Sequence, residues 1–184
     1  MISVVAMTDS CKVAYRFWGE LMARKCFYSF YYDEDNWRVG TVRNIGTIEG
    51  QPLVSANEFE EIKRKGDKAV ADWIAGNMAG RSSVIVLIGT NTASRKWVKH
   101  EIKYAFDNGK ALLGIHVHRL LNKNGYASTK GADPFSTFTV GTDKKPLTNW
   151  AKTYDPGGVD SKGVYDTIKN NIESWVEESI RLRA

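Results

Sequence analysis

Short apolar runs recur along this chain, separated by longer stretches in which apolar residues fall every three or four positions. The runs at 25–30, 83–88 and 111–117 predict strands. The run at 83–88 is apolar almost throughout, which is typical of a strand buried on both faces of a parallel sheet. Two weaker patterns predict a short strand at 53–54 and an edge strand near 147–151.

The spacing of apolar residues predicts helices between these strands. The helical stretches are 10–21, 37–45, 59–76, 97–107 and 164–179. A polar turn at 33–36 is expected to precede the second of them, and the third is expected to be one long helix. Ser94 is a suitable N-cap for the fourth helix, and Asn108-Gly109 provides its stop.

Strands that alternate with helices imply an α/β fold, in which a parallel sheet carries helices on both faces. Ligands of such sheets bind beyond the carboxyl ends of the strands. We therefore expect three segments to meet at one edge of the sheet: 30–36, the loop after 53–54, and 89–101. The irregular stretch at 119–160 is long for a compact domain, and long loops of this kind are often functional.

Composition narrows the class of protein. The chain has 184 residues, 42% of them hydrophobic, and a formal net charge of +5, which suits one soluble domain. Its densest basic run, 63–65, lies in a helical pattern beside glutamates and indicates a solvated helix face. We expect no nucleic-acid partner and no membrane span, because the longest apolar run, 84–88, is far too short. Cys11 and Cys26 have no metal-ligand or disulfide-framework spacing, which fits a reducing, cytoplasmic setting.

Trp97 and Glu101 are the most informative pair of residues. Four positions apart on a predicted helix, they share one side of it, next to the core stripe of Val98 and Ile102. We expect Glu101 to be half-buried at the rim of the sheet, beside the indole ring and facing the cleft. Such surroundings suit a carboxylate that stabilises developing positive charge. Spacing alone favours a structural role, since the helix dipole favours an early glutamate and a Trp beside a core stripe usually packs.

Other chemistries have weaker support. His116 and His118 alternate along a strand and face one side, but no third ligand accompanies them, so we expect no metal site. The chain lacks Gly-x-Gly-x-x-Gly and phosphate-loop motifs, which disfavours a dehydrogenase or nucleoside triphosphatase. A receiver-like domain would use Asp33 and Asp35 as a Mg²⁺ pocket, yet it needs another Asp where this chain has Gly89-Thr90.

Several segments resemble a known family, and they do so in the same order. Residues 94–102 resemble the TIR-domain segment in which a Trp precedes the catalytic Glu by four positions, and 27–33 resembles the family's opening strand. The remaining segments resemble the bacterial TIR-like branch of Thoeris anti-phage defence: Arg38-Val39, Val42-Arg43-Asn44, Val86-Leu87-Ile88-Gly89, Thr92, Arg95, Gly114-Ile115-His116 and Asp133-Pro134-Phe135. This resemblance implies a flavodoxin-like, TIR-like domain over 22–184 that ends in the C-terminal helix. Residues 1–21 have no counterpart in the family, and from the apolar spacing at 10–21 we expect them to form a short helical extension.

The resemblance also implies an enzyme that cleaves the bond between nicotinamide and ribose in NAD. That bond has a positively charged leaving group, so a carboxylate that stabilises an oxocarbenium-like transition state can act without a strong acid. Glu101 is the implied catalyst, NAD is the substrate, and neither a cofactor nor a metal is expected. The implied NAD-binding residues are Phe30, Tyr31, Asp33, Arg38, Arg43, Asn44 and Trp97.

These implied ligands have structural alternatives. Phe30, Tyr31 and Trp97 offer stacking faces, and Arg38 and Arg43 could reach a pyrophosphate. Phe30 could equally be a core strand residue with Tyr31 as its exposed neighbour, because strand side chains alternate. The two arginines could instead pair with the acidic residues that precede them.

The resemblance further implies a diffusible nucleotide signal that reaches a downstream effector, with a homo-oligomer or a phage-derived trigger as possible regulators. The alternative is a non-catalytic TIR-like adaptor that mediates protein assembly. The segment 46–57 matches the family poorly, so the product is left open among linear, cyclic and conjugated ADP-ribose.

Overall fold

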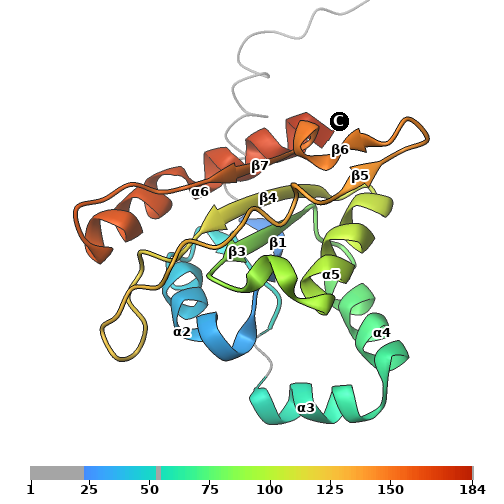
Figure 1. Ribbon diagram of the computed structural model, residues 1–184, viewed down its shortest axis with the longest axis horizontal. Helices are drawn as coiled ribbons and strands as arrows, with labels where there is room; N and C mark the ends of the chain where they lie inside the picture. Colours follow the sequence, from blue (N-terminus) through green and yellow to red (C-terminus); the bar gives the residue numbers. More distant parts are fainter. Residues whose placement is uncertain (1–22, 53–54, 184) are drawn as a thin grey trace, which may run out of the picture.

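A five-stranded parallel sheet forms the centre of the molecule (Figure 1). The computed structural model describes residues 23–52 and 55–183. The strands are β1 (Arg24–Ser29), β2 (Ile48–Glu49), β3 (Ser83–Ile88), β4 (Ala111–His116) and β7 (Ala151–Tyr154). Their order across the sheet, β2-β1-β3-β4-β7, is the flavodoxin-like order. The predicted fold class is therefore confirmed, whereas the predicted helix at 10–21 lies outside the described residues.

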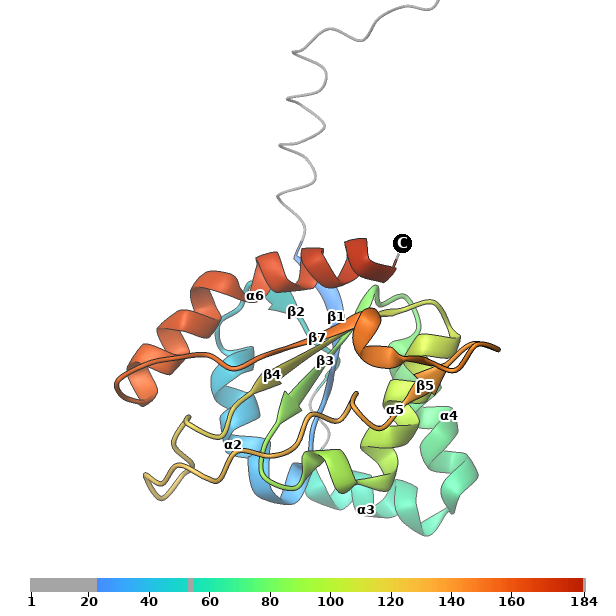
Figure 2. The same cartoon turned by 45° about the horizontal axis from the view of Figure 1, so that its top comes forward.

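Helices cover both faces of this sheet. They are α2 (Tyr32–Arg43), α3 (Ala56–Arg64), α4 (Asp67–Met78), α5 (Lys96–Asp107) and α6 (Ser161–Arg183). One core cluster joins apolar residues of α2 and α6 to one sheet face, and a second joins those of α4 and α5 to the other. Figure 2 shows α2 and the α4–α5 pair on opposite sides of the strands. No helix in the described part of the chain is long and apolar enough to cross a membrane.

The predicted long helix at 59–76 is wrong, because the structure divides it at Gly66. This residue has φ +94° and ψ 171°, a backbone conformation that is essentially restricted to glycine. The helical spacing continues across the break, so the pattern alone gave no warning of it. The break turns α3 away from α4 (Figure 1), and the rings of Phe59 and Trp73 remain in contact, with centroids 5.8 Å apart.

Two helix starts also differ from prediction. α2 begins at Tyr32, so the acidic residues at 33–35 occupy its first turn rather than a preceding turn, where their charges complement the helix dipole. Ser94 does not cap α5. It lies in a 3-10 turn and its hydroxyl donates to the backbone oxygen of Asn91, whereas Arg95 takes the N-cap position without a side-chain cap.

The weakly predicted strands are the least accurate. The expected strand at 53–54 lies outside the described residues, and the edge strand that pairs with β1 is β2, five residues earlier. Near 147–151, a 3-10 turn at Leu147–Asn149 precedes the actual strand β7. The irregular region also holds a small antiparallel pair, β5 (Thr139–Val140) and β6 (Lys145–Pro146).

Candidate active site

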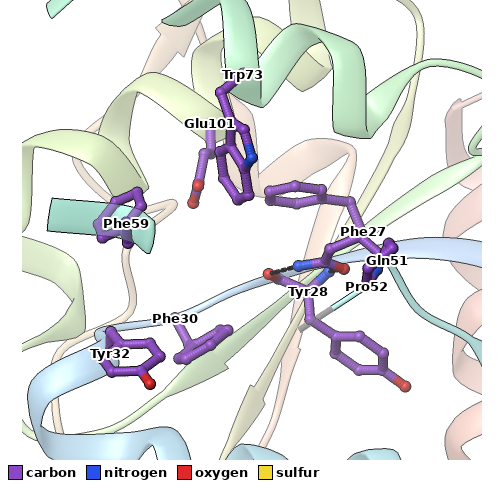
Figure 3. Close-up of a pocket in the computed structure, with 9 residues that line it drawn as sticks. All are labelled: Phe27, Tyr28, Phe30, Tyr32, Gln51, Pro52, Phe59, Trp73 and Glu101. Atoms are coloured by element: carbon purple, nitrogen blue, oxygen red, sulfur yellow. Dashed lines mark hydrogen bonds between the residues drawn. The ribbon is translucent and has the colours of Figure 1, made fainter. Parts of the chain in front are cut away.

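A pocket lies beside the carboxyl-terminal part of β1, and its lining includes residues of both core clusters (Figure 3). Its volume is about 70 Å³, so it can enclose one end of a ligand rather than a whole dinucleotide. The lining residues are Phe27, Tyr28, Phe30, Tyr32, Gln51, Pro52, Phe59, Trp73 and Glu101. Apart from one carboxyl and one amide, the side chains that form it are apolar or aromatic.

Glu101 reaches this pocket from the second turn of α5. The neighbouring residues Val98 and Ile102 are buried against the sheet and fix the rotation of the helix. Glu101 is only 8% exposed, so the prediction of a half-buried rim position is wrong: packing draws the carboxyl inside. One carboxylate oxygen, Oε2, accepts a hydrogen bond of 2.5 Å from the hydroxyl of Ser29.

The electrostatics of Glu101 follow from its burial. Burial raises the pKa of this carboxyl to about 8, and the hydrogen bond from Ser29 opposes that rise. Neither cause is a neighbouring charge. A carboxyl in this state is mostly protonated at neutral pH. Within residues 23–52 and 55–183 no cation neutralises it, which is typical of functional rather than purely structural carboxyls.

The side chain of Gln51 organises the segment that borders the pocket. Its Oε1 accepts from the backbone N–H of Tyr28 and its Nε2 donates to the backbone oxygen of the same residue, each at 2.8 Å (Figure 3). β2 pairs with β1 only at Arg24 and Lys25. The amide of Gln51 therefore replaces a strand on the open edge of β1, where unpaired backbone groups would otherwise be buried.

Aromatic rings make up most of the remaining pocket lining. Phe30 and Tyr32 follow β1 and lie 6.1 Å apart between centroids, while Phe59 of α3 and Trp73 of α4 form a second pair. In Figure 3 the carboxyl of Glu101 lies beside the indole of Trp73 and points into the space between the pairs. Flat apolar surfaces of this kind suit a planar heterocyclic ring.

Trp97 and Tyr31 do not line this pocket, contrary to their predicted stacking role. Trp97 is partly buried against the α4–α5 core and makes an edge contact with the ring of His100. Tyr31 precedes α2, and its ring packs beneath the guanidinium of Arg95, 3.7 Å from the ring centroid. Of the three predicted stacking residues, the structure brings only Phe30 to the pocket.

The two arginines predicted to bind a pyrophosphate are engaged in internal contacts. Arg38 is buried, forms an ion pair of 3.0 Å with Asp35, and donates to the backbone oxygen of Leu120. Arg43 donates to the backbone oxygen of Gln51 at 2.5 Å and lies over the ring of Tyr28. The structural alternative, pairing with a preceding acidic residue, holds for Arg38, whereas Arg43 contacts a backbone oxygen and an aromatic ring instead.

The remaining predicted ligands are also distant from the pocket lining. Asp33 is exposed in the first turn of α2 and borders a separate polar groove, and Asn44 is the exposed C-cap of the same helix. The receiver-like alternative fails at the same place, because Asp35 is buried against Arg38 rather than open to an ion.

Several residues that build this site were missed by sequence reasoning, among them Ser29, Tyr32, Gln51, Phe59 and Trp73. Strand alternation could have placed Ser29, since it falls two positions after Phe27 on the side of α5. Phe59 and Trp73 belong to a helical stripe, so they were interpreted as core alone. Nothing in the sequence marks Gln51, whose role depends on where β2 stops pairing.

Comparisons with known proteins give the context of this geometry. Residues 27–122, slightly more than half of the chain, match the family model described as the TIR-like domain of Thoeris protein ThsB. Among curated proteins, the chain is 34% identical over 119 residues to the putative cyclic ADP-D-ribose synthase ThsB1 of Bacillus cereus (strain MSX-D12). That match covers 62% of this chain and 62% of the relative, and the family match includes Ser29, Gln51, Trp73 and Glu101.

Proposed function

This chain belongs to the family of the TIR-like domain of Thoeris protein ThsB, and from that premise we propose that it cleaves NAD at the bond between nicotinamide and ribose. The pocket is the proposed site of reaction and Glu101 the proposed catalytic residue. The observation that carries the proposal is a buried carboxyl with no cationic partner in the described residues, set among aromatic rings. A positively charged substrate supplies the charge that the site itself does not.

The chemistry requires little from the protein. When the bond between ribose C1′ and the pyridinium nitrogen breaks, its electron pair goes to the nitrogen and neutral nicotinamide leaves. Positive charge then develops at C1′, and an ionised Glu101 stabilises it. Attack by water on C1′ gives linear ADP-ribose and releases one proton. Attack by a nucleophile of the same ADP-ribose unit gives a cyclic product instead.

The pocket favours this reaction over reactions on larger polar substrates. Its size suits the nicotinamide ring, and the flat faces of Phe30, Tyr32 and Trp73 can pack against that ring. Exclusion of water strengthens the attraction between the carboxylate and the developing charge. The rest of NAD extends outward from the ring.

Arg95 is the cation that we propose for the pyrophosphate, in place of Arg38 and Arg43. Its guanidinium lies over the ring of Tyr31. Tyr31 stands in the chain between the pocket residues Phe30 and Tyr32. One nitrogen of Arg95, Nε, donates to the backbone oxygen of Asn91, which orients the guanidinium. A planar guanidinium held in this way can bind two phosphate oxygens.

The relative ThsB1 is named a putative cyclic ADP-D-ribose synthase, which supports a cyclic nucleotide as the product here. We propose that this product acts as a signal in Thoeris anti-phage defence and is read by a separate effector. A non-catalytic adaptor is the competing function. It would leave the fate of NAD independent of Glu101.

The test is incubation of the purified protein with NAD, with nicotinamide release and nucleotide products followed by chromatography. We expect Glu101→Gln to lower the rate at least about 100-fold, while the exposed Glu173→Gln on α6 serves as the matched control and keeps the wild-type rate. Equal nicotinamide release by wild type and Glu101→Gln would contradict the proposal, as would absence of release from wild type across pH 6–9 at high protein concentration.

A further inference from the structure

Ser29 occupies a special position next to Glu101. It is the last residue of β1, only 1% exposed, and its hydroxyl donates the 2.5 Å hydrogen bond to Oε2 of Glu101. Pairing with Val86 of β3 fixes its backbone. Alternation along β1 sends Tyr28 to the α2–α6 side and Ser29, like Phe27, to the side of α5.

The other groups around Glu101 offer it little polar support. The neighbouring side chains from β1, the residue after it, α3 and α4 are uncharged aromatic rings: Phe27, Phe30, Phe59 and Trp73. Among the pocket residues, the other titratable groups are the phenols of Tyr28 and Tyr32. The remaining polar side chain, the amide of Gln51, binds the backbone of β1 through both of its ends.

In the part of the chain that the structure describes, Ser29 is thus the one side chain that donates a hydrogen bond to this carboxyl. We propose that Ser29 is a positioning residue of the reaction, whose hydroxyl stabilises the ionised form of Glu101 and aims its free oxygen into the pocket. This inference rests on the proposed NAD cleavage and adds to it the group that controls the charge of the catalyst.

The physical reason is the strength of a hydrogen bond to an ion. A hydroxyl that donates to a carboxylate stabilises the ionised form more than the neutral acid. Without it, burial would act on Glu101 unopposed, and the pKa would rise above its present value of about 8. A hydrogen bond to a charged group corresponds to a shift of about one pKa unit.

The first experiment is the pH profile of nicotinamide release by wild type and Ser29→Ala. We expect the rising limb of the kcat profile to move up by about one pH unit, so that the rate falls about tenfold at pH 7 and recovers near pH 10. Ser29→Thr, which keeps the hydroxyl, should restore the wild-type profile. The matched control is Ser83→Ala, because Ser83 is also buried in a central strand but its hydroxyl bonds to Ala111 and Ser179.

Two results would overturn the inference. One is a loss of activity in Ser29→Ala that is equal at every pH, which indicates a packing defect. The other is a shifted profile in Ser83→Ala, which indicates a general effect of removing a buried hydroxyl.

A second measurement does not depend on NAD and separates failure of this inference from failure of the proposed function. Urea unfolding is compared at pH 5 and pH 9 for wild type, Ser29→Ala, Glu101→Gln and the double variant. We expect the destabilisation by Ser29→Ala to grow by about fivefold in the unfolding equilibrium constant between these pH values, since Glu101 ionises only toward the higher one. In the Glu101→Gln background it should not grow. Equal growth in both backgrounds, or none in either, would sink the inference even if NAD is cleaved.

Discussion

Two buried carboxyls lie close to the carboxyl end of β1, and they differ in what surrounds them. Asp35 is 1% exposed and pairs at 3.0 Å with Arg38, itself 3% exposed. Glu101 accepts a hydrogen bond from Ser29 and faces a pocket. Burial raises the pKa of both carboxyls, but Arg38 counteracts it at Asp35. Asp35 therefore has a cationic partner within the protein, whereas Glu101 can receive a cationic partner from a ligand.

The Asp35–Arg38 pair also joins separate parts of the fold. The guanidinium of Arg38 donates to the backbone oxygens of Leu120 and Tyr126, so it ties α2 to the loop after β4. Gly89 packs directly on the carboxylate of Asp35, where a Cβ would have no room. The pair is therefore a structural connection, and the comparison separates a residue that holds the fold together from one that is free for chemistry.

The largest effect on stability should come from breaking the ion pair between Asp35 and Arg38. Arg38→Ala leaves Asp35 buried without its cation, and we expect a loss of about 3–5 kcal/mol of the free energy of unfolding at neutral pH. Urea unfolding measures it. Adding Asp35→Asn should return part of that loss, since the uncompensated charge disappears. A cost below about 1 kcal/mol for Arg38→Ala would show that the pair is unimportant to the fold.

Glu101 should behave in the opposite way, because its substitution stabilises the protein. The folded-state pKa, about 8, lies above the ordinary glutamate pKa of 4.5, so folded Glu101 keeps a proton that the unfolded chain releases. Its contribution to stability is present below about pH 4.5 and is lost as the pH rises through about 8. Glu101→Gln removes this loss. Relative to wild type, the variant should gain on the order of 3 kcal/mol between pH 5 and pH 8.

Calorimetric melting curves at the two pH values check this prediction, with Glu173→Gln as the exposed control. If the melting temperatures of Glu101→Gln and wild type differ by the same amount at pH 5 and pH 8, Glu101 is not a buried carboxyl with a raised pKa.

The two tryptophans provide a smaller but selective contrast. Trp73 lines the pocket and Trp97 does not. Trp73→Leu should raise the KM for NAD about tenfold through the lost ring surface. Trp97→Leu should lower the melting temperature while leaving KM within about twofold. Steady-state kinetics and melting curves of both variants test the assignment, and the reverse pattern would place the substrate beside Trp97 instead.

The smallest expected effect concerns Arg95. Arg95→Gln removes the cation over Tyr31 and should raise the KM for NAD about three- to tenfold with little change in kcat, because the pyrophosphate is remote from the breaking bond. The increase should shrink at high ionic strength, where salt screens the wild-type contact. An unchanged KM in Arg95→Gln would contradict the assignment of Arg95 to the pyrophosphate.

The sequence predicted the sheet well where its pattern was strong. The apolar runs that became β3 and β4 are nearly continuous, since both faces of these strands are covered. In β1 only the last four residues are buried. The weak patterns at 53–54 and 147–151 were poor guides to β2 and β7. Edge strands of two to four residues carry too few buried positions to leave a clear period.

The candidate site was only partly predictable. Glu101 and Phe30 could be named because each belongs to a segment with a recognisable order of residues. Arg38 was predicted as a ligand from its place after β1. Asp35 lies one helical turn away from it, however, and the ion pair between them occupies the guanidinium. Trp73 was overlooked because residues of a pocket wall and residues of a core stripe have the same helical spacing. The turn at Gly66 separates α3 from α4 and so decides whether Trp73 faces the pocket or the core.

By itself, the sequence determined the alternation of the central strands with helices, the apolar faces that bury them, and the place of Glu101 beside the core stripe of α5. Those features depend on local periodicity, which a linear pattern records. Only the tertiary structure decided that Ser29 meets Glu101 across 72 positions of chain, that Gln51 closes the edge of β1, and that Arg38 is occupied. Burial and hydrogen bonding between distant segments set the charge of a carboxyl, and neither quantity exists until the chain has folded.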